Sequence, residues 1–148
     1  HIEEIASNPA VDELYIGLND LHLSLGLDFL FEPLALGLLD WMIERIKASG
    51  KNFGFGGIAA INSGEIPAEY ILAEHVRLGS RYVILSSIFS KNVDIYNVEN
   101  RTERIKKALD HLNEKTEELS KRSSEQIEAD RRIIKDKIQQ VVKRLRLS

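Results

Sequence analysis

The sequence contains no cysteine, so the chain can form neither a disulfide framework nor a thiolate metal site. This composition agrees with a reducing compartment, and we expect a cytoplasmic protein. No run of apolar residues is long enough to span a bilayer, and no signal peptide is visible, so we expect no membrane partner. The sequence opens at His1 without an initiator methionine, which leads us to expect a fragment or a processed chain.

Aromatic residues are scarce in the second part of the chain, where residues 93–148 contain only Tyr96. Residues 1–92 carry 6 lysine and arginine residues against 12 aspartate and glutamate residues, whereas residues 93–148 carry 14 against 11. The two signs are interspersed in the second part, without the basic block of a nucleic-acid-binding arm. Because little aromatic surface is available for stacking on bases, we expect no nucleic-acid partner.

The 148 residues, of which 43% are hydrophobic, suffice for one domain or a domain with an appendage. Apolar periodicity predicts helices from Pro33 to Gly50 and from Pro67 to Gly79. These helices alternate with three apolar segments that predict strands, namely Asp12–Ile16, Asn52–Ala60 and Tyr82–Phe89. The alternation is typical of parallel βαβ units with right-handed connections.

Three features in this region carry weak chemical signals. The glycines of residues 52–57, NFGFGG, match neither the dinucleotide fingerprint nor the phosphate loop, and they indicate close backbone approach. Ser86 and Ser87 lack a nucleophile motif, so they either bind a ligand by hydrogen bonds or form a polar strand end. His75 lies among apolar neighbours, which favours a packing or surface role over a catalytic one.

Residues 93–148 differ in character, because the segment from Asn100 to Leu147 has neither glycine nor proline and is dense in glutamate, lysine and arginine. Asn100 with Glu103, and Ser123 with Gln126, are spaced as helix-capping pairs. Two narrow apolar seams with the heptad a/d spacing run out of phase with each other. The first comprises Ile105, Leu109, Leu112, Thr116 and Leu119, and the second comprises Ile134, Ile138, Val141 and Leu145.

These seams predict a helical extension over residues 93–148, formed either by two helices or by a short coiled coil with a phase slip. Each seam is narrow and therefore needs a partner surface, on this domain or on another chain. Exposed sheet edges and unpaired seams together favour an oligomer over a monomer.

The stretch from Val11 to Gly26, VDELYIGLNDLHLSLG, holds the best candidate site. Gly17 ends the first predicted strand, and Asn19 and Asp20 follow at its carboxyl end. Loops at the carboxyl ends of parallel strands are where α/β proteins keep their chemistry. Because aspartate is a favoured N-cap residue, a capping role for Asp20 is the alternative.

This stretch resembles the segment D-x-(hydrophobic)-x-I-G-x-x-D-L-x-x-S-L-G of the HpcH/HpaI aldolase/citrate lyase family, whose members are phosphoenolpyruvate/pyruvate-binding TIM barrels. The segments FGFGGIA and ILAEHVRLGSRYVILSSIF are similar to the seventh and eighth βα units of that family. The resemblance covers roughly residues 1–92. It implies an α/β fold that is the C-terminal part of a (β/α)8 barrel, about three βα units with the sixth to eighth strands, followed by the charged helical tail of residues 93–148.

The resemblance also implies a site. Asp20 would be one carboxylate ligand of a divalent metal, magnesium or manganese, because hard cations prefer oxygen ligands. Backbone groups of Gly17, Leu18, Asn19 and Asp20 would bind the carboxylate of a small 2-oxo acid or acyl substrate. The family has a small residue or proline where Leu18 stands here, and its second metal carboxylate, substrate-binding arginine and catalytic histidine lie on earlier strands.

Two functions follow from these residues. The first is a metal-dependent aldolase or lyase that cleaves or forms a C–C bond next to a pyruvate-type enolate, with this chain incomplete and inactive alone. The alternative is a non-catalytic, oligomerising half-barrel scaffold or interaction module. In both cases we expect a homo-oligomer or association with the rest of the barrel.

Overall fold

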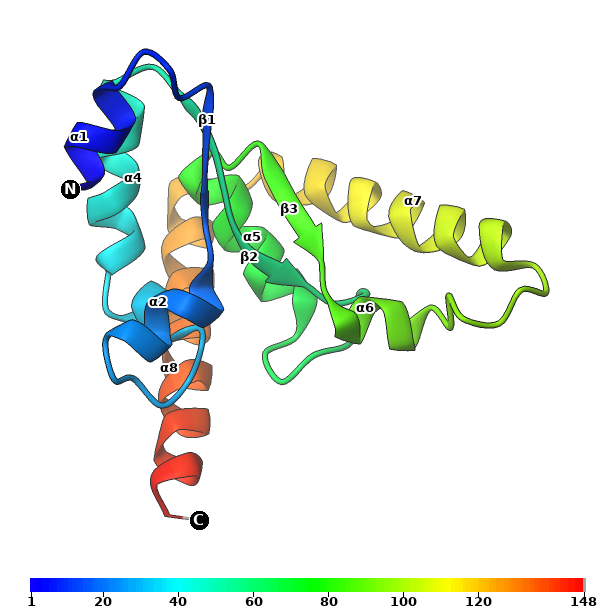
Figure 1. Ribbon diagram of the computed structural model, residues 1–148. Helices are drawn as coiled ribbons and strands as arrows, with labels where there is room; N and C mark the ends of the chain where they lie inside the picture. Colours follow the sequence, from blue (N-terminus) through cyan, green and yellow to red (C-terminus); the bar gives the residue numbers. More distant parts are fainter. Residues whose placement is uncertain (148) are drawn as a thin grey trace.

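The computed structural model describes residues 1–147, and within that range the chain forms an α/β unit with three strands and eight helices. The strands are β1 (Glu13–Ile16), β2 (Asn52–Ile58) and β3 (Tyr82–Leu85). They form one parallel sheet in the order β1-β2-β3, with β2 in the centre (Figure 1). The expected α/β class with parallel strands is therefore confirmed.

The helices lie before, between and after these strands. α1 packs against α4, and both α4 and α5 pack against β2. The eight helices are α1 (Ile2–Ser7), α2 (Leu18–Ser24), α3 (Glu32–Ala35), α4 (Leu38–Ala48), α5 (Ala68–Leu78), α6 (Ser87–Asn92), α7 (Arg101–Ser120) and α8 (Ser124–Arg146).

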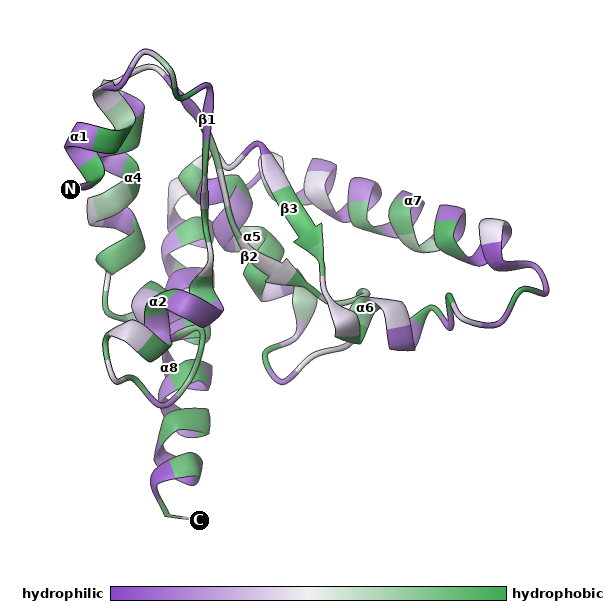
Figure 2. Ribbon diagram, in the orientation of Figure 1, coloured by the Kyte–Doolittle hydropathy of each residue, from purple (hydrophilic) through white to green (hydrophobic). Residues whose placement is uncertain are grey.

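The sheet is covered on one face only. Successive strand residues point to opposite faces, and Leu14 and Ile16 of β1 and Phe53 of β2 are buried against the helices. The opposite face, which we call the open face, carries Glu13, Tyr15, Asn52, Tyr82 and Ile84. Figure 2 shows β3 largely in the hydrophobic colour, and yet Ile84 is 57% exposed. A strand that is apolar at nearly every position is typical of a parallel sheet covered on both faces, and the exposure of Ile84 shows that β3 is not covered in this way.

Two predicted elements are shorter in the structure. The helix expected from Pro33 to Gly50 is divided into α3 and α4, because Gly37 adopts a left-handed conformation with φ of 76°. The strand expected from Tyr82 to Phe89 ends at Leu85, because the hydroxyl of Ser86 accepts a hydrogen bond from the N–H of Phe89 and so begins α6.

The helical tail consists of α7 and α8, which extend in different directions in Figure 1. Ser123 and Gln126 form the predicted capping box of α8, whereas Asn100 is left-handed and its side chain caps nothing. The two helices do not form a coiled coil with each other. α7 packs against α5, and α8 packs against α5 and α3.

The apolar seams of the tail complete the core of the α/β unit. From α7, Leu112 and Leu119 are buried, and from α8 the buried side chains are Ile134, Ile138, Val141 and Val142. Their partner surface is thus the helical layer behind the sheet. None of the helices in residues 1–147 combines the length and the apolar composition needed to cross a membrane.

Candidate functional site

The candidate site lies where β1 passes into α2, at the carboxyl edge of the sheet. Gly17 is the N-cap residue of α2, and Leu18, Asn19 and Asp20 form its first turn. Asp20 is therefore not the N-cap, and no side chain caps this helix. The N–H of Leu21 is the first to bond within the helix, to the carbonyl of Gly17 at 2.9 Å. The preceding N–H groups of the first turn have no acceptor inside the helix.

The carboxylate of Asp20 is exposed and folds back over the N-cap residue. A Cβ atom added to Gly17 would lie 3.1 Å from Oδ2 of Asp20. This approach is closer than an ordinary van der Waals contact, so a larger residue at position 17 would displace the carboxylate. Gly17 thus keeps Asp20 next to the first-turn N–H groups, where the positive end of the helix favours negative charge.

Leu18 has a different role from its neighbours. Its side chain is only 1% exposed and packs on Gly56 of β2, where an added Cβ would lie 2.9 Å from Cδ1 of Leu18. Gly56 also has φ of 58°, which glycine adopts without strain. Leu18 therefore anchors the first turn of α2 in the core, and only its backbone can face a ligand. Asn19 and Asp20 are exposed at the edge.

The other strand ends contribute polar groups to the same edge. The carboxyl ends of β2 and β3 are close, because a Cβ added to Gly57 would lie 3.3 Å from Cβ of Ser86. Since the Ser86 hydroxyl is engaged in capping α6, the polar-strand-end interpretation is the one that the structure supports for this serine. Within the described residues, no group of three or more histidine, aspartate or glutamate side chains is arranged to hold a metal ion.

The open face carries a cluster of hydroxyl groups that the sequence analysis did not identify. The hydroxyl of Tyr82 donates a hydrogen bond to Oε1 of Glu13 at 2.5 Å. The hydroxyl of Tyr15 accepts one from the N–H of Ile84 at 2.9 Å and donates one to the carbonyl of Gly56. Period-two alternation places Glu13 and Tyr15 on one face of β1, but only the register of the strands brings Tyr82 of β3 to the same face.

Both tyrosines in this cluster are held in the protonated form. Burial raises the pKa of Tyr15 above its ordinary value, and the hydrogen bond from Ile84 opposes that rise only in part. The hydrogen bond to the carboxylate of Glu13 raises the pKa of Tyr82. At neutral pH both side chains therefore act as hydrogen-bond donors and not as bases.

A groove of about 530 Å³ runs along the outer edge of β1, and we call it the edge groove. Its apolar lining includes Ile5 of α1, Leu21 of α2 and Met42 of α4. Glu13 and Asp20 supply its only charged groups among the lining residues. The candidate carboxylate thus lies at one end of a groove beside an unpaired strand edge.

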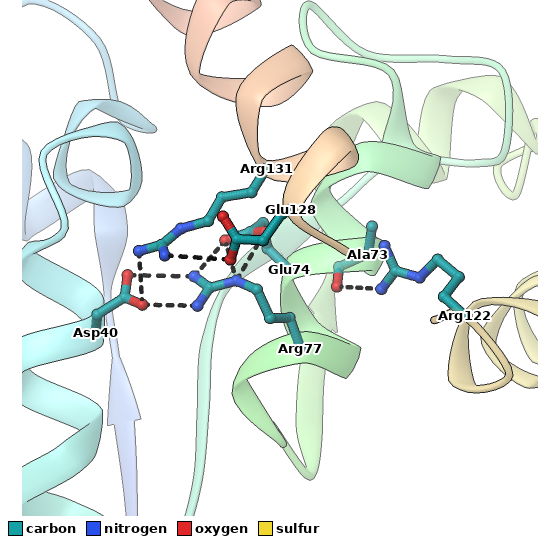
Figure 3. A network of polar contacts seen from close by, with 7 residues as sticks. All are labelled: Asp40, Ala73, Glu74, Arg77, Arg122, Glu128 and Arg131. Carbon is teal, nitrogen blue, oxygen red and sulfur yellow. Dashed lines mark hydrogen bonds and ion pairs between the residues drawn. The ribbon is translucent and has the colours of Figure 1, made fainter. Parts of the chain in front are cut away.

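Behind the sheet, an ionic network joins α4, α5 and α8 (Figure 3). The guanidinium of Arg77 contacts Oδ1 of Asp40 at 2.6 Å and Oε2 of Glu74 at 2.6 Å, and Arg131 contacts the same oxygen of Asp40 at 3.0 Å. Burial alone would raise the pKa of Asp40, but the two arginines outweigh it and hold the pKa below its ordinary value. The network fixes the tail helix α8 to the helical layer.

A third arginine, Arg122, holds the turn between α7 and α8. Arg122 donates to the carbonyl of Ala73 in α5 at 3.0 Å (Figure 3). It also pairs with Asp130 of α8 at 2.5 Å. The tail is therefore attached to the α/β unit by charged contacts as well as by its apolar seams.

His75 has a packing role, as its apolar neighbours predicted. Its ring stacks on Phe55 with 3.8 Å between ring centroids and an interplanar angle of 2°. It is 5% exposed, and Nε2 has no hydrogen-bond partner among the described residues. Burial lowers the pKa of His75 to about 3, so the ring is neutral at physiological pH.

The fold and its carboxyl edge define the chain as an α/β protein with a one-sided parallel sheet and a docked helical tail. Comparisons with protein-family models, curated proteins and solved structures found no match to this chain.

Proposed function

We propose that the chain contributes one carboxylate ligand and an anion-binding first turn to the site of a divalent-metal-dependent aldolase or lyase. The observation that carries this proposal is the exposed carboxylate of Asp20, held over Gly17 at the carboxyl edge of a parallel sheet. A three-stranded sheet with helices on one face and an open opposite face agrees with the C-terminal part of a (β/α)8 barrel.

The residues present fit a partial site. Asp20 offers a hard oxygen ligand, and a magnesium or manganese ion keeps several waters when one or two carboxylates bind it. Such a cation, when bound, supplies Lewis acidity next to the 2-oxo group of a pyruvate-type substrate. The N–H groups of Leu18, Asn19 and Asp20 have no acceptor inside α2 and would bind the substrate carboxylate. The buried side chain of Leu18 keeps these groups in position.

The rest of the site must come from a second segment or chain. Among residues 1–147, Asp20 belongs to no group of three or more histidine, aspartate or glutamate side chains that could hold a metal ion. The chain alone is accordingly expected to show no turnover in a retro-aldol assay. Association with the segment that completes the barrel would supply the second carboxylate, the substrate-binding arginine and the catalytic base.

Manganese binding tests this proposal by calorimetry, with and without oxalate as a planar mimic of the pyruvate enolate. We expect weak binding that oxalate strengthens and that Asp20→Asn removes. Asn19→Ala is the matched control, because it changes an exposed neighbour and keeps the carboxylate. Equal binding by the wild-type chain and Asp20→Asn, or measurable retro-aldol turnover by the chain alone, would contradict the proposal.

The alternative function is a non-catalytic scaffold that oligomerises. It is favoured by the apolar exposure of the open face, where Tyr15 is 39% and Ile84 57% exposed. Sedimentation velocity distinguishes the two functions when it is combined with the calorimetry. A stable oligomer that binds no manganese at Asp20 supports the scaffold, whereas manganese binding that depends on Asp20 supports the lyase.

A further inference from the structure

We propose that the edge groove binds an extended segment of another polypeptide, which adds a strand to β1 and alternates apolar with basic side chains. This proposal rests on the proposed function, because that function requires a second segment or chain, and the edge groove indicates the chemistry of that partner. Four features carry it: a free strand edge, an apolar floor, an acidic rim and the absence of basic lining residues.

The free edge supplies the main-chain part of the recognition. Among the described residues, β1 pairs with β2 alone, so one side of Glu13–Ile16 has no strand partner. The N–H and C=O groups on such an edge form a template for another strand. Peptides that add a strand to an edge gain affinity from these main-chain hydrogen bonds and specificity from alternate side chains.

The apolar floor determines one half of the partner's side chains. Ile5 from α1, Leu21 from α2 and Met42 from α4 lie on the helical side of the β1 edge. Ile5 is 48% exposed, so it gains burial when the groove is filled. Every second residue of an added strand points toward this floor, and a β-branched apolar side chain suits that position.

The acidic rim determines the charge of the partner's remaining side chains. The remaining side chains of an added strand point toward the open face, where Glu13 is exposed and accepts the hydrogen bond from Tyr82. No lysine or arginine lines the groove. A basic side chain therefore meets an attractive potential, and an acidic one meets repulsion. A second copy of β1 would bring its own Glu13 to this rim, which disfavours pairing between identical copies.

Peptide titration of the isotope-labelled chain by NMR tests this inference. The probes are a short peptide that alternates valine and lysine, its counterpart that alternates valine and glutamate, and a valine–lysine peptide interrupted by proline. We expect the valine–lysine peptide to shift the resonances of β1, Ile5 and Leu21 and to bind about fivefold more tightly than the glutamate peptide, which corresponds to about 1 kcal/mol. The proline peptide should not bind, because it cannot pair along the edge.

Charge variants at one exposed position sharpen the test. Glu13→Gln keeps the hydrogen-bond acceptor for Tyr82 and should reduce the preference between the two peptides, because only Asp20 then remains charged in the groove, whereas Glu13→Lys should reverse it. Equal affinity of both peptides for the wild-type chain, shifts that map elsewhere, or no binding at millimolar peptide would overturn the inference. Manganese binding at Asp20 is measured separately, so a failure of the strand inference is distinguishable from a failure of the metal site.

Discussion

The hydroxyl of Tyr15 accepts a hydrogen bond from the backbone N–H of Ile84 at 2.9 Å, and it thereby joins β1 to β3 across the central strand. The register explains why this contact forms. β2 pairs Gly54 with Tyr82 and Gly57 with Ile84, so β2 has one residue more than β3 over this interval. Such a bulge disrupts the ladder locally, and the Tyr15 hydroxyl provides a partner there.

Tyr15→Phe should therefore destabilise the chain by about 1 kcal/mol, because the N–H of Ile84 loses its partner. Urea denaturation measures the loss, and amide hydrogen exchange should show faster exchange at Ile84. Tyr82→Phe is the matched control, since it removes an exposed hydrogen bond to Glu13 from the same face. Equal effects of the two variants, with unchanged exchange at Ile84, would refute the bridging role of Tyr15.

Acid should destabilise the fold through His75. The unfolded histidine takes up a proton below its ordinary pKa of 6.5, whereas the folded ring stays neutral until about pH 3. Stability contributed by this residue is thus lost as the pH falls from 6.5 toward 3, by at most about 1.4 kcal/mol per pH unit.

The variant His75→Leu isolates this contribution. It removes the titrating group and the unpaired Nε2 atom while keeping an apolar side chain beside Phe55. Its unfolding free energy should depend less on pH between about pH 6 and pH 4 than that of the wild type. Parallel pH profiles for the two proteins would show that His75 is not the group responsible.

The ionic network behind the sheet should respond asymmetrically to mutation. Arg77→Met leaves Glu74, which is 3% exposed, as a buried and unpaired charge. We expect a loss of about 3 to 5 kcal/mol in the free energy of unfolding. The double variant Arg77→Met with Glu74→Leu removes both charges and should recover most of that loss in chemical denaturation. A double variant no more stable than Arg77→Met would contradict this account of the network.

Gly17→Ala should weaken manganese binding more than it affects folding. The backbone of Gly17, with φ of −72° and ψ of 98°, is accessible to alanine, so the fold is expected to tolerate the change. The added Cβ would lie 3.1 Å from Oδ2 of Asp20, so the carboxylate must move. Calorimetry should show weaker binding at a nearly unchanged unfolding midpoint. Unchanged manganese affinity would contradict the role of Gly17 in positioning the Asp20 carboxylate for metal binding.

Much of the fold was predictable from local patterns. Short apolar segments identified all three strands, and the residues Pro67 and Gly79 correctly bounded α5. Ser123 with Gln126 correctly marked the start of α8. These signals are local, since they depend on residues within one turn or one strand of each other.

The errors arose where tertiary context decides the local structure. Gly37 interrupts an apolar period that continues on both sides, and periodicity alone cannot detect such a break. The tail seams resemble those of a coiled coil, but their partners are α5 and, for α8, also α3, which are distant in the sequence. The cluster of Tyr15, Tyr82 and Glu13 depends on strand register, which the sequence does not specify.

We propose that Asp20 and the first turn of α2 form part of a divalent-cation site. Paramagnetic broadening by manganese, in the presence of oxalate, of the amide resonances of the labelled wild-type chain tests this proposal. We expect the amides of residues 17–21 to broaden first and Asp20→Asn to abolish this selectivity. Broadening that begins instead at other acidic surfaces, such as Glu114 and Glu118 of α7, would contradict the proposal.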